Sequence, residues 1–477
     1  MAQSRTPMSA VDTAWLRMES PASAMMIGAV LVFDRPIAMA AFRELLNERF
    51  LRYRRFRQRV VKHNERYFWE DDEWFDLDNH LHVVALPGKG CQKALQNFAS
   101  DLNSTPLNHC HPLWQAHYVD GYQGGCALVI RIHHCIADGI SLVRVLLSLT
   151  DDQPTANVRA LRSRSHHTPD QLPEWRKVLH RIRRNSNIAR NQLGQLASNV
   201  MEDPSYLSRL AKEGMQMGRD LAQLTFSAED PVTALKGDLC GRKQVAWSDP
   251  LDLAEVKATA RAMGGTVNDV LMCAATGALH SFLKNSGQPL PKDYIHVAVP
   301  FNLRLLNQPI TNLGNQFGLV LVPLPVQSCC PRDRFNRIHR DMINLKQTYQ
   351  AQVSFGLLDV LGRGPELLER RALEMLSRKA SAVMTNVPGP RKPLYMCGGR
   401  LVQPMFWVPQ TGEVGIGLSI FSYADQVQFG VISDQRLIAK PVLVTQAFTE
   451  AFQELRDLAL NSGSGDGGVA RAASPLN

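Results

Sequence analysis

The segment that most constrains this chain is residues 126–134, CALVIRIHH, which is almost continuously apolar and rich in β-branched residues. A run of this kind is typical of a central strand covered on both faces, so it predicts a sheet with helices packed against it. The run ends on His133 and His134, and Asp138 and Gly139 follow after three intervening residues. The sequence therefore predicts a strand-to-helix turn that carries polar side chains.

Strand-like and helix-like segments alternate in two parts of the chain, on either side of a different middle section. Apolar residues with a period near two or near 3.6 mark these segments. The expected strands are 29–33, 126–134, 294–299, 318–326, 382–386, 415–422 and 426–432, and the expected helices are 39–50, 140–149, 253–263 and 266–284. Thr266 and Asp269 have the spacing of a capping box, and the last two strands have that of a hairpin. The pattern predicts an α/β fold in two halves.

The middle section has no strand candidate, and it holds most of the positive charge. Residues 161–190 carry eight basic and two acidic side chains, a net charge of +6 in a chain whose total is +9. Within it, residues 175–190 combine an apolar stripe with arginines, as amphipathic helices do. We therefore predict the following division: a first domain at 1–150, a basic helical linker at 151–240, a second domain at 241–460 and a Gly/Ser-rich disordered tail at 461–477.

The two histidines admit three interpretations from the residues alone. A histidine at a strand end can present a neutral imidazole as a general base, with Asp138 fixing the turn that Gly139 permits or orienting the ring. A pair of core histidines is the plainer alternative. Metal binding by both histidines is disfavoured, because neighbouring strand residues point to opposite faces.

The pattern His-His-x-x-x-Asp-Gly resembles that of the CoA-dependent acyltransferase superfamily, which includes chloramphenicol acetyltransferase and peptide-synthetase condensation domains. Further motifs are similar to those of the bacterial wax ester synthase/diacylglycerol acyltransferase family: Pro112-Leu113-Trp114, Thr266–Val270, Leu313–Gly318, Thr385–Pro390 and the opening residues 8–12 with Glu19. The chain departs from this family at Thr385, where serine is commoner, and at residues 23–26, where Pro-Met-His is usual.

This resemblance implies two chloramphenicol-acetyltransferase-like domains with an active-site tunnel between them. It implies that a fatty acyl group passes from acyl-CoA to a long-chain alcohol or to diacylglycerol, with His134 as the base. The other roles it implies are a catalytic Asn268, a structural motif of His133, Asp138 and Gly139, and substrate binding by Pro112, Leu113, Trp114, Asn315 and Asn386. For Asp138 an arginine partner such as Arg131 is expected.

Transfer can then be direct, because a positioned alcohol and a base need no acyl-enzyme. The chain lacks the G-x-S-x-G motif of serine esterases, and Cys135 on a buried strand is expected to be inert. We expect no cofactor, no metal and no nucleic-acid partner, with acyl-CoA as a substrate.

The longest apolar runs are far shorter than the roughly 20 residues that cross a bilayer. We therefore expect a cytoplasmic protein that is peripheral at the inner membrane face or on lipid droplets. Residues 175–190 then lie on the anionic surface, or they form a solvated linker helix. Two alternatives stay open: a carrier-protein-dependent condensation or ester-forming acyltransferase, and a non-catalytic lipid-binding scaffold.

Overall fold

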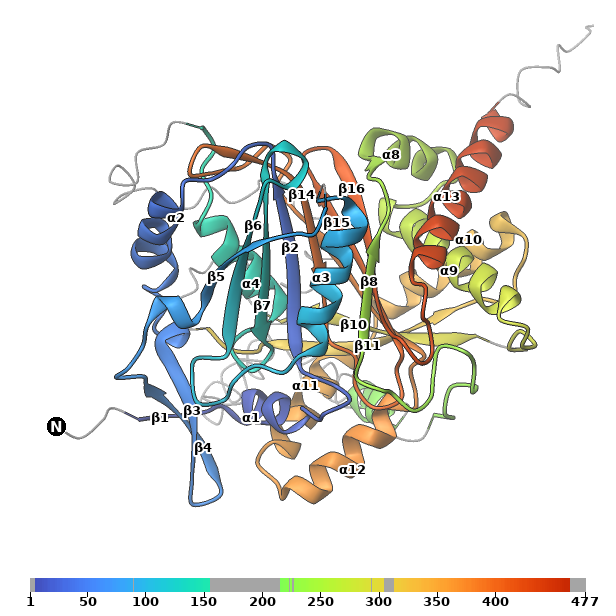
Figure 1. The fold of residues 1–477 in the computed structure, drawn as a ribbon. Helices are drawn as coiled ribbons and strands as arrows, with labels where there is room; N and C mark the ends of the chain where they lie inside the picture. The colour runs from blue at the N-terminus through green and yellow to red at the C-terminus, as the bar shows by residue number, and fades with distance from the viewer. Residues whose placement is uncertain are drawn as a thin grey trace, which may run out of the picture.

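The computed structural model describes residues 5–88, 90–154, 215–222, 224, 227–292, 294–303 and 313–463. Two large β-sheets with helices on their faces make up most of the molecule (Figure 1), which confirms the expected α/β class with two sheet-rich domains. Most of the predicted linker, including the basic segment 175–190, lies outside the described residues, as do residues 464–477 of the predicted tail.

The first sheet holds the motif strand in its interior. From edge to edge it consists of β13 (Tyr395–Met396), β14 (Gly399–Trp407), β2 (Met26–Phe33), β7 (Cys126–His133), β6 (Trp114–Asp120) and β5 (Leu81–Ala85). β7 is antiparallel to both of its neighbours, and all but one of its residues are buried. The expected central strand is thus present.

The second sheet is built entirely from the second half of the chain. Its strands in order are β11 (Phe317–Leu324), β10 (Ile295–Asn302), β12 (Ala382–Pro388), β15 (Ile416–Tyr423), β16 (Gln426–Asp434) and β8 (Lys243–Trp247), with β9 (Leu251–Asp252) also paired to β16. β15 and β16 form the expected hairpin, whose turn residues Ala424 and Asp425 have φ values of 47° and 58°. A small third sheet holds β1 (Thr6–Pro7), β4 (Arg66–Asp71) and β3 (Gln58–His63).

Helices cover both faces of the first sheet and the outer side of the second (Figure 1). The α-helices whose bounds lie within the described residues include α1 (Ala10–Arg17), α2 (Met39–Leu45), α3 (Gln92–Ser104), α4 (Gly139–Ser148), α8 (Leu253–Ala262), α9 (Val267–Asn285), α10 (Pro331–Leu345), α11 (Gln350–Leu361), α12 (Glu366–Ser377) and α13 (Val442–Gly463). Shorter helical turns are η1 (Leu46–Phe50), η2 (Arg54–Arg57), η3 (Leu77–Asn79) and η4 (Tyr122–Gly124). α3 and α4 pack on opposite faces of the first sheet, in separate apolar clusters.

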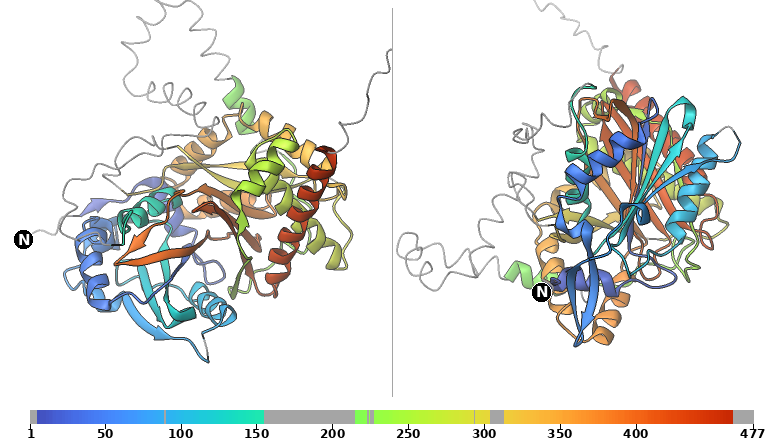
Figure 2. Two further views of the ribbon diagram at one scale, coloured as in Figure 1. Left: turned by 90° about the horizontal axis from the view of Figure 1, so that it is seen from above. Right: turned by 60° about the vertical axis from the view of Figure 1, so that its left-hand side comes forward.

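The two halves of the chain are joined by a strand that crosses between them. β14 comes from the second half but pairs with β2, from Leu401 opposite Phe33 to Trp407 opposite Gly28. Figure 2 shows this orange strand among the blue and teal strands of the first half. The domain bounds 1–150 and 241–460 stay a prediction.

Most predicted elements are present, with small shifts at their ends. The capping box of α9 is formed, because Thr266 Oγ1 accepts from the Asp269 amide and the Asp269 carboxylate accepts from the Thr266 amide. The helix expected over 39–50 ends at Leu45 and continues as the π-helical turn η1, which places Phe50 against Phe56. The tail predicted from residue 461 begins too early, because α13 continues to Gly463.

Candidate active site

His134 lies just beyond the C-terminal end of β7, on the face of the first sheet that carries α4. Alternate residues of a strand point to opposite faces. Val129 accordingly packs in the cluster under α3, whereas Leu128 packs in the cluster under α4. His134 continues the even-numbered row and His133 the odd-numbered one. The two imidazoles therefore face different surroundings, as the sequence predicted.

The side chain of Asn315 holds the His134 imidazole in one orientation. Asn315 Nδ2 donates two hydrogen bonds of 2.8 Å, one to Asp12 Oδ1 and one to the backbone oxygen of His134. Both partners are acceptors, so they fix the orientation of the amide and leave Oδ1 facing His134 Nδ1 at 3.0 Å. An amide oxygen can only accept, so the proton of the neutral ring lies on Nδ1 and Nε2 keeps a lone pair. This assignment makes Nε2 the atom that can take a proton.

Asp12 anchors this arrangement from the first turn of α1. Its Oδ1 accepts from the backbone amide of Asn315 at 2.9 Å as well as from the side chain. Burial raises the pKa of Asp12, although the Arg55 guanidinium, 3.8 Å from Oδ2, and the hydrogen bonds oppose this shift. The carboxyl group thus ties residue 315 to the start of the chain.

Two aromatic side chains enclose His134. Trp15 stacks on the imidazole with ring centroids 4.1 Å apart and an interplanar angle of 14°, and the Phe317 ring lies 5.4 Å away. His134 is only 5% exposed, and this burial lowers its pKa to about 4. The ring is therefore neutral at pH 7, which is the form that a general base requires.

Asp138 caps α4 and also contacts the second half of the chain. Its Oδ1 accepts from the Ser141 amide at 2.7 Å, and its Oδ2 accepts from the Gln316 amide at 3.1 Å. Arg131, named as an example of a partner, instead donates to Gln115 Oε1 and to backbone oxygens of residues 102 and 105. Asp138 thus caps α4 and ties the turn to residue 316.

Gly139 does not play the part expected of it. The turn after Asp138 was expected to need a glycine, yet Gly139 is the first residue of α4 and its φ lies outside the left-handed region. A Cβ added there would meet nothing within 4 Å. Helical geometry at this position suits any residue, so the backbone itself does not require glycine.

His133 is fully buried and faces an acidic partner rather than His134. Its Nδ1 accepts from the Cys135 amide at 3.1 Å, and its Nε2 lies 3.6 Å from Glu19 Oε2. Glu19 also contacts His109 Nε2 at 2.7 Å. Burial alone would raise the pKa of Glu19, but the hydrogen bond with His109 and the nearby His133 imidazole lower it to about 2. This geometry suits a structural histidine.

The Pro112-Leu113-Trp114 motif lies in the core beside the end of β7. The Leu113 oxygen accepts from the His133 amide at 2.9 Å. Trp114 is 1% exposed, donates from Nε1 to the Phe56 oxygen and stacks on His80. The motif therefore supports the strand end, and a substrate contact for its residues stays a prediction.

Asn268 and Asn386, both expected at the site, contact each other. Asn386 Nδ2, on β12, donates to Asn268 Oδ1, in the first turn of α9, at 2.8 Å. Both side chains are partly exposed. Their bond leaves the Nδ2 group of Asn268 as a donor for another acceptor.

Cys135 has the surroundings of an inert thiol. Its side chain is fully buried, and burial raises its pKa well above the ordinary value. A thiol that stays protonated is a poor nucleophile. Within the described residues, no group of three or more His, Cys, Asp or Glu side chains could hold a metal ion, and no helix is both long and apolar enough to cross a bilayer.

Two residues around His134 were not identified as site residues from the sequence, and a third makes a contact that was not predicted. Asp12 was noted only as part of an opening motif and Trp15 was not noted, because neither lies near His134 in the sequence. Asn315 was expected to bind substrate; it contacts the base, and its substrate contact stays a prediction. The opening motif and residues 313–318 were the only signal for these contacts.

The residues at 23–26, where the chain departs from the usual family pattern, also touch the histidine turn. The Met25 oxygen accepts from the His134 amide at 2.7 Å, and Met25 is fully buried. Ser23 Oγ donates to the Gln410 oxygen. This segment therefore supports the backbone of His134.

Family models match most of the chain. A model for the wax ester synthase/diacylglycerol acyltransferase catalytic domain matches residues 8–271, and one for the WS/DGAT C-terminal domain matches residues 313–456. Together they include every candidate site residue.

Individual relatives agree with these matches. A Mycobacterium tuberculosis protein named "Putative diacyglycerol O-acyltransferase Rv3740c" is 30% identical over 94% of this chain and 99% of its own. The Acinetobacter baylyi "O-acyltransferase WSD" is 26% identical over 77% of this chain and 78% of its own.

Solved structures show the same fold. The wax ester synthase/diacylglycerol acyltransferase from Marinobacter aquaeolei VT8 superposes with a TM-score of 0.66 and 22% identity, covering 96% of this chain and all of that one. The starter condensation domain of rhizomide synthetase, in complex with C8-CoA, gives a TM-score of 0.56 at 15% identity, covering 96% of this chain and 95% of that one.

Proposed function

Because this chain belongs to the wax ester synthase/diacylglycerol acyltransferase family, we propose that it transfers a long-chain fatty acyl group from acyl-CoA to a long-chain alcohol or to diacylglycerol. One observation carries the proposal: a neutral, buried His134 whose Nδ1 proton is held by Asn315, so that Nε2 is available as a base. Wax ester formation is the main reaction that we propose, and triacylglycerol synthesis the lesser one.

The proposed reaction is a direct transfer. His134 Nε2 takes the proton of the acceptor hydroxyl as its oxygen attacks the thioester carbonyl carbon. The resulting tetrahedral oxyanion collapses, the C–S bond breaks, and the CoA thiolate receives the proton from Nε2. The base is thereby restored, and the products are the ester and free CoA.

The oxyanion in this sequence needs a fixed hydrogen-bond donor. We propose that Asn268 faces the substrates from the second domain, with its Nδ2 as the donor. Its bond with Asn386 supports this proposal, because a donor must itself be held in position. We propose that Pro112, Leu113 and Trp114 form part of the wall of the substrate tunnel.

The choice of substrates rests on the family and on relatives. The names of the relatives state diacylglycerol O-acyltransferase and O-acyltransferase activities, and a protein of the same fold holds C8-CoA. Acceptors of this kind partition into membranes, so we propose a cytoplasmic enzyme that is peripheral at the inner membrane face or on lipid droplets.

The test is a transfer assay on purified protein with palmitoyl-CoA and either hexadecanol or diacylglycerol, in which free CoA and the ester are measured. His134→Ala should lower kcat by roughly 10²–10⁴ with the fold intact, which is the usual contribution of a general base. His133→Ala should instead lower the melting temperature. The exposed His63, on β3, supplies the control His63→Ala, which should change neither quantity.

Near-wild-type turnover of His134→Ala would refute the role of this residue. Transfer from an acyl carrier protein but not from acyl-CoA would indicate the carrier-dependent alternative. Binding of both substrates with no transfer at all would indicate a lipid-binding scaffold.

A further inference from the structure

The indole N–H of Trp15 is a buried hydrogen-bond donor beside the proposed base. Trp15 is 6% exposed, and its ring stacks on the His134 imidazole with centroids 4.1 Å apart. Its Nε1 is buried and has no hydrogen-bond acceptor among the described residues. An indole N–H can donate but not accept, and when buried it usually finds a partner. The one polar atom of this side chain is therefore available to an acceptor that a substrate brings.

Other tryptophans show that the position of the donor matters. In the described part of the chain, Nε1 of Trp69, Trp247 and Trp407 is also buried without an acceptor. Trp69 packs under an arginine side chain, and Trp247 and Trp407 pack against each other in the cluster under α3. Of these four described indoles, only Trp15 stacks on His134. The lack of an acceptor alone therefore indicates no ligand, but its combination with this stacking does.

α1 holds Trp15 in a fixed position. Asp12 and Trp15 are three residues apart in this helix, so they lie on the same face of it. Asp12 binds the backbone amide and the side-chain amide of Asn315, and near the other end of α1 Arg17 forms an ion pair of 3.0 Å with Glu369. Both ends of α1 are therefore attached to the second half of the chain. A donor held in this way needs no rearrangement when charge develops on a substrate.

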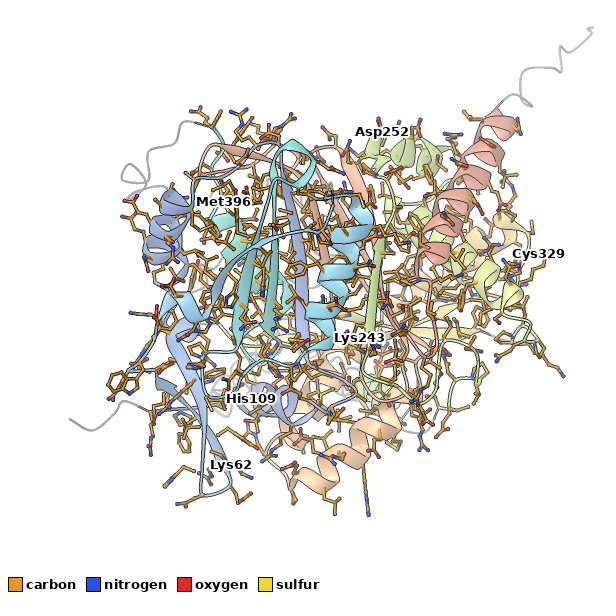
Figure 3. The ribbon with its side chains drawn as sticks, viewed as in Figure 1. Lys62, His109, Lys243, Asp252, Cys329 and Met396 are labelled. Carbon is orange, nitrogen blue, oxygen red and sulfur yellow. The ribbon has the colours of Figure 1, made fainter. Side chains whose placement is uncertain are left out.

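α1 and the histidine motif lie at the same end of the first sheet. In Figure 3, His109, which shares Glu19 with His133, is labelled low in the molecule, at the level at which Figure 1 shows α1. Trp15 contacts His134, and Glu19, which follows the end of the helix by two residues, contacts His133. One short segment thus faces both histidines, and Trp15 is its contact with the proposed base.

The stacking geometry indicates which substrate oxygen the N–H can reach. The two rings are nearly parallel, with an interplanar angle of 14° and a centroid separation of 4.1 Å. A hydroxyl that gives its proton to His134 Nε2 lies in the plane of the imidazole, whereas an acceptor of the indole N–H lies in the plane of the indole. The two oxygens are therefore different atoms that lie close together. In the proposed reaction, the oxygen nearest to the attacking hydroxyl is that of the thioester carbonyl, which becomes the oxyanion.

From these observations we propose that Trp15 Nε1 donates a hydrogen bond to the carbonyl oxygen of the acyl-CoA thioester, and that this bond strengthens as the oxygen becomes an oxyanion. The inference rests on the proposed function, in which Asn268 is the first donor to the same oxygen. Trp15 is then a catalytic residue and not only a wall of the site. An indole N–H keeps its proton throughout the ordinary pH range, so its contribution does not depend on pH.

Trp15→Phe removes the donor and keeps an aromatic ring against His134. We expect kcat to fall about 10- to 150-fold, which is the usual contribution of a hydrogen bond to a charged group. The acid limb of kcat/KM should keep its pH, because no titratable group is changed. Trp407→Phe is the matched control, since it makes the same change at another buried indole, on the opposite face of the first sheet. It should lose about as much stability in guanidinium denaturation as Trp15→Phe but keep the wild-type kcat.

A binding measurement separates the contact with the carbonyl from other roles of the ring. Palmitoyl-CoA and S-hexadecyl-CoA have chains of the same length, but the thioether of the second ligand has no carbonyl oxygen. In calorimetric titrations, Trp15→Phe should weaken the binding of palmitoyl-CoA about threefold or more, because a hydrogen bond between neutral groups is lost. The same variant should leave the binding of S-hexadecyl-CoA unchanged.

Wild-type kcat in a folded Trp15→Phe variant, or equal weakening of both ligands, would overturn the inference while leaving the proposed function standing. An inactive wild type would instead contradict the proposed function, and the two titrations would still test the contact with the carbonyl. Where Trp15→Phe fails to fold, benzothienylalanine at position 15 keeps the shape of tryptophan with sulfur in place of the N–H. That replacement should give the same loss of kcat, and an unchanged kcat would also overturn the inference.

Discussion

Replacing Asn315 by leucine tests whether this amide sets the protonation state of His134. Leucine has nearly the same volume, but it can neither accept from Nδ1 nor donate to the His134 oxygen. Asp12 Oδ1 keeps the backbone amide of residue 315 as a donor at 2.9 Å. The substitution removes the bond from Nδ2 to Asp12 Oδ1, and with it the two side-chain contacts with His134.

The magnitude follows from those two contacts. A buried polar group left without a partner costs about 1–3 kcal/mol. Suppose that this cost favours the tautomer of His134 with its proton on Nε2. The fraction of His134 in the active tautomer then falls about 5- to 150-fold, because about 1.36 kcal/mol corresponds to a tenfold change in an equilibrium. We expect kcat to fall about 10- to 100-fold, with the KM for acyl-CoA little changed and the free energy of unfolding lowered by about 2 kcal/mol.

The assay is steady-state release of CoA, with guanidinium denaturation for stability. Gln316→Ala is the matched control, because the Gln316 side chain is exposed and its contact with Asp138 uses the backbone amide. A second variant, Asn315→Asp, tests the pH dependence of kcat/KM, which would not change if Asn315 had only a structural role. A carboxylate beside Nδ1 favours the charged imidazole, so the acid limb of kcat/KM should shift to higher pH. Wild-type kcat in a folded Asn315→Leu variant would refute the reasoning.

Three further predictions concern pH, mechanism and the membrane. The acid limb of kcat/KM in the wild type should lie near pH 4, because burial lowers the pKa of His134 to about 4 and the base is protonated only below that pH. An acid limb near pH 6.5 would contradict this prediction. Initial-rate plots should intersect, since direct transfer needs both substrates bound together; parallel plots or an acylated Cys135 in mass spectrometry would contradict direct transfer. Binding to anionic liposomes should weaken as salt is added. It should also weaken when Arg181, Arg183 and Arg184 are replaced by glutamate, because each basic residue near the surface contributes about 1 kcal/mol. Equal binding by the triple variant would assign these residues to a solvated linker.

The sequence predicted those parts of the site that depend on local pattern. The buried strand, the opposite facing of His133 and His134, and the turn fixed by Asp138 all follow from residues within about twelve positions of one another. Strand alternation and helix capping are local effects, so one segment contains the information. Gly139 is the exception, since its presence suggested a turn requirement that the backbone does not have.

Contacts between distant segments were not predictable in this way. Asp12 and Asn315 are 303 residues apart, and no periodicity links them. β14 was missed for a different reason, because its Pro404 argues against a strand. β13 pairs only with residues 399 and 400 of β14. That edge of β14 therefore has no β13 partner beside Pro404, and a residue without an amide hydrogen is tolerated there.

Residues 315 and 316 contact the histidine motif from a distant segment of the chain. Asn315 binds His134, the first polar residue of the turn, and the Gln316 amide binds Asp138, the last one. Consecutive residues of one segment thus contact both ends of a turn that is five residues long. A strand-to-helix turn alone could cap α4, but it could not decide which nitrogen of His134 carries the proton. That decision comes from Asn315, which is itself held by Asp12 at the start of the chain. The base therefore requires three distant segments to be folded together, and the motif His-His-x-x-x-Asp-Gly is only the part of this arrangement that is visible in one stretch of sequence.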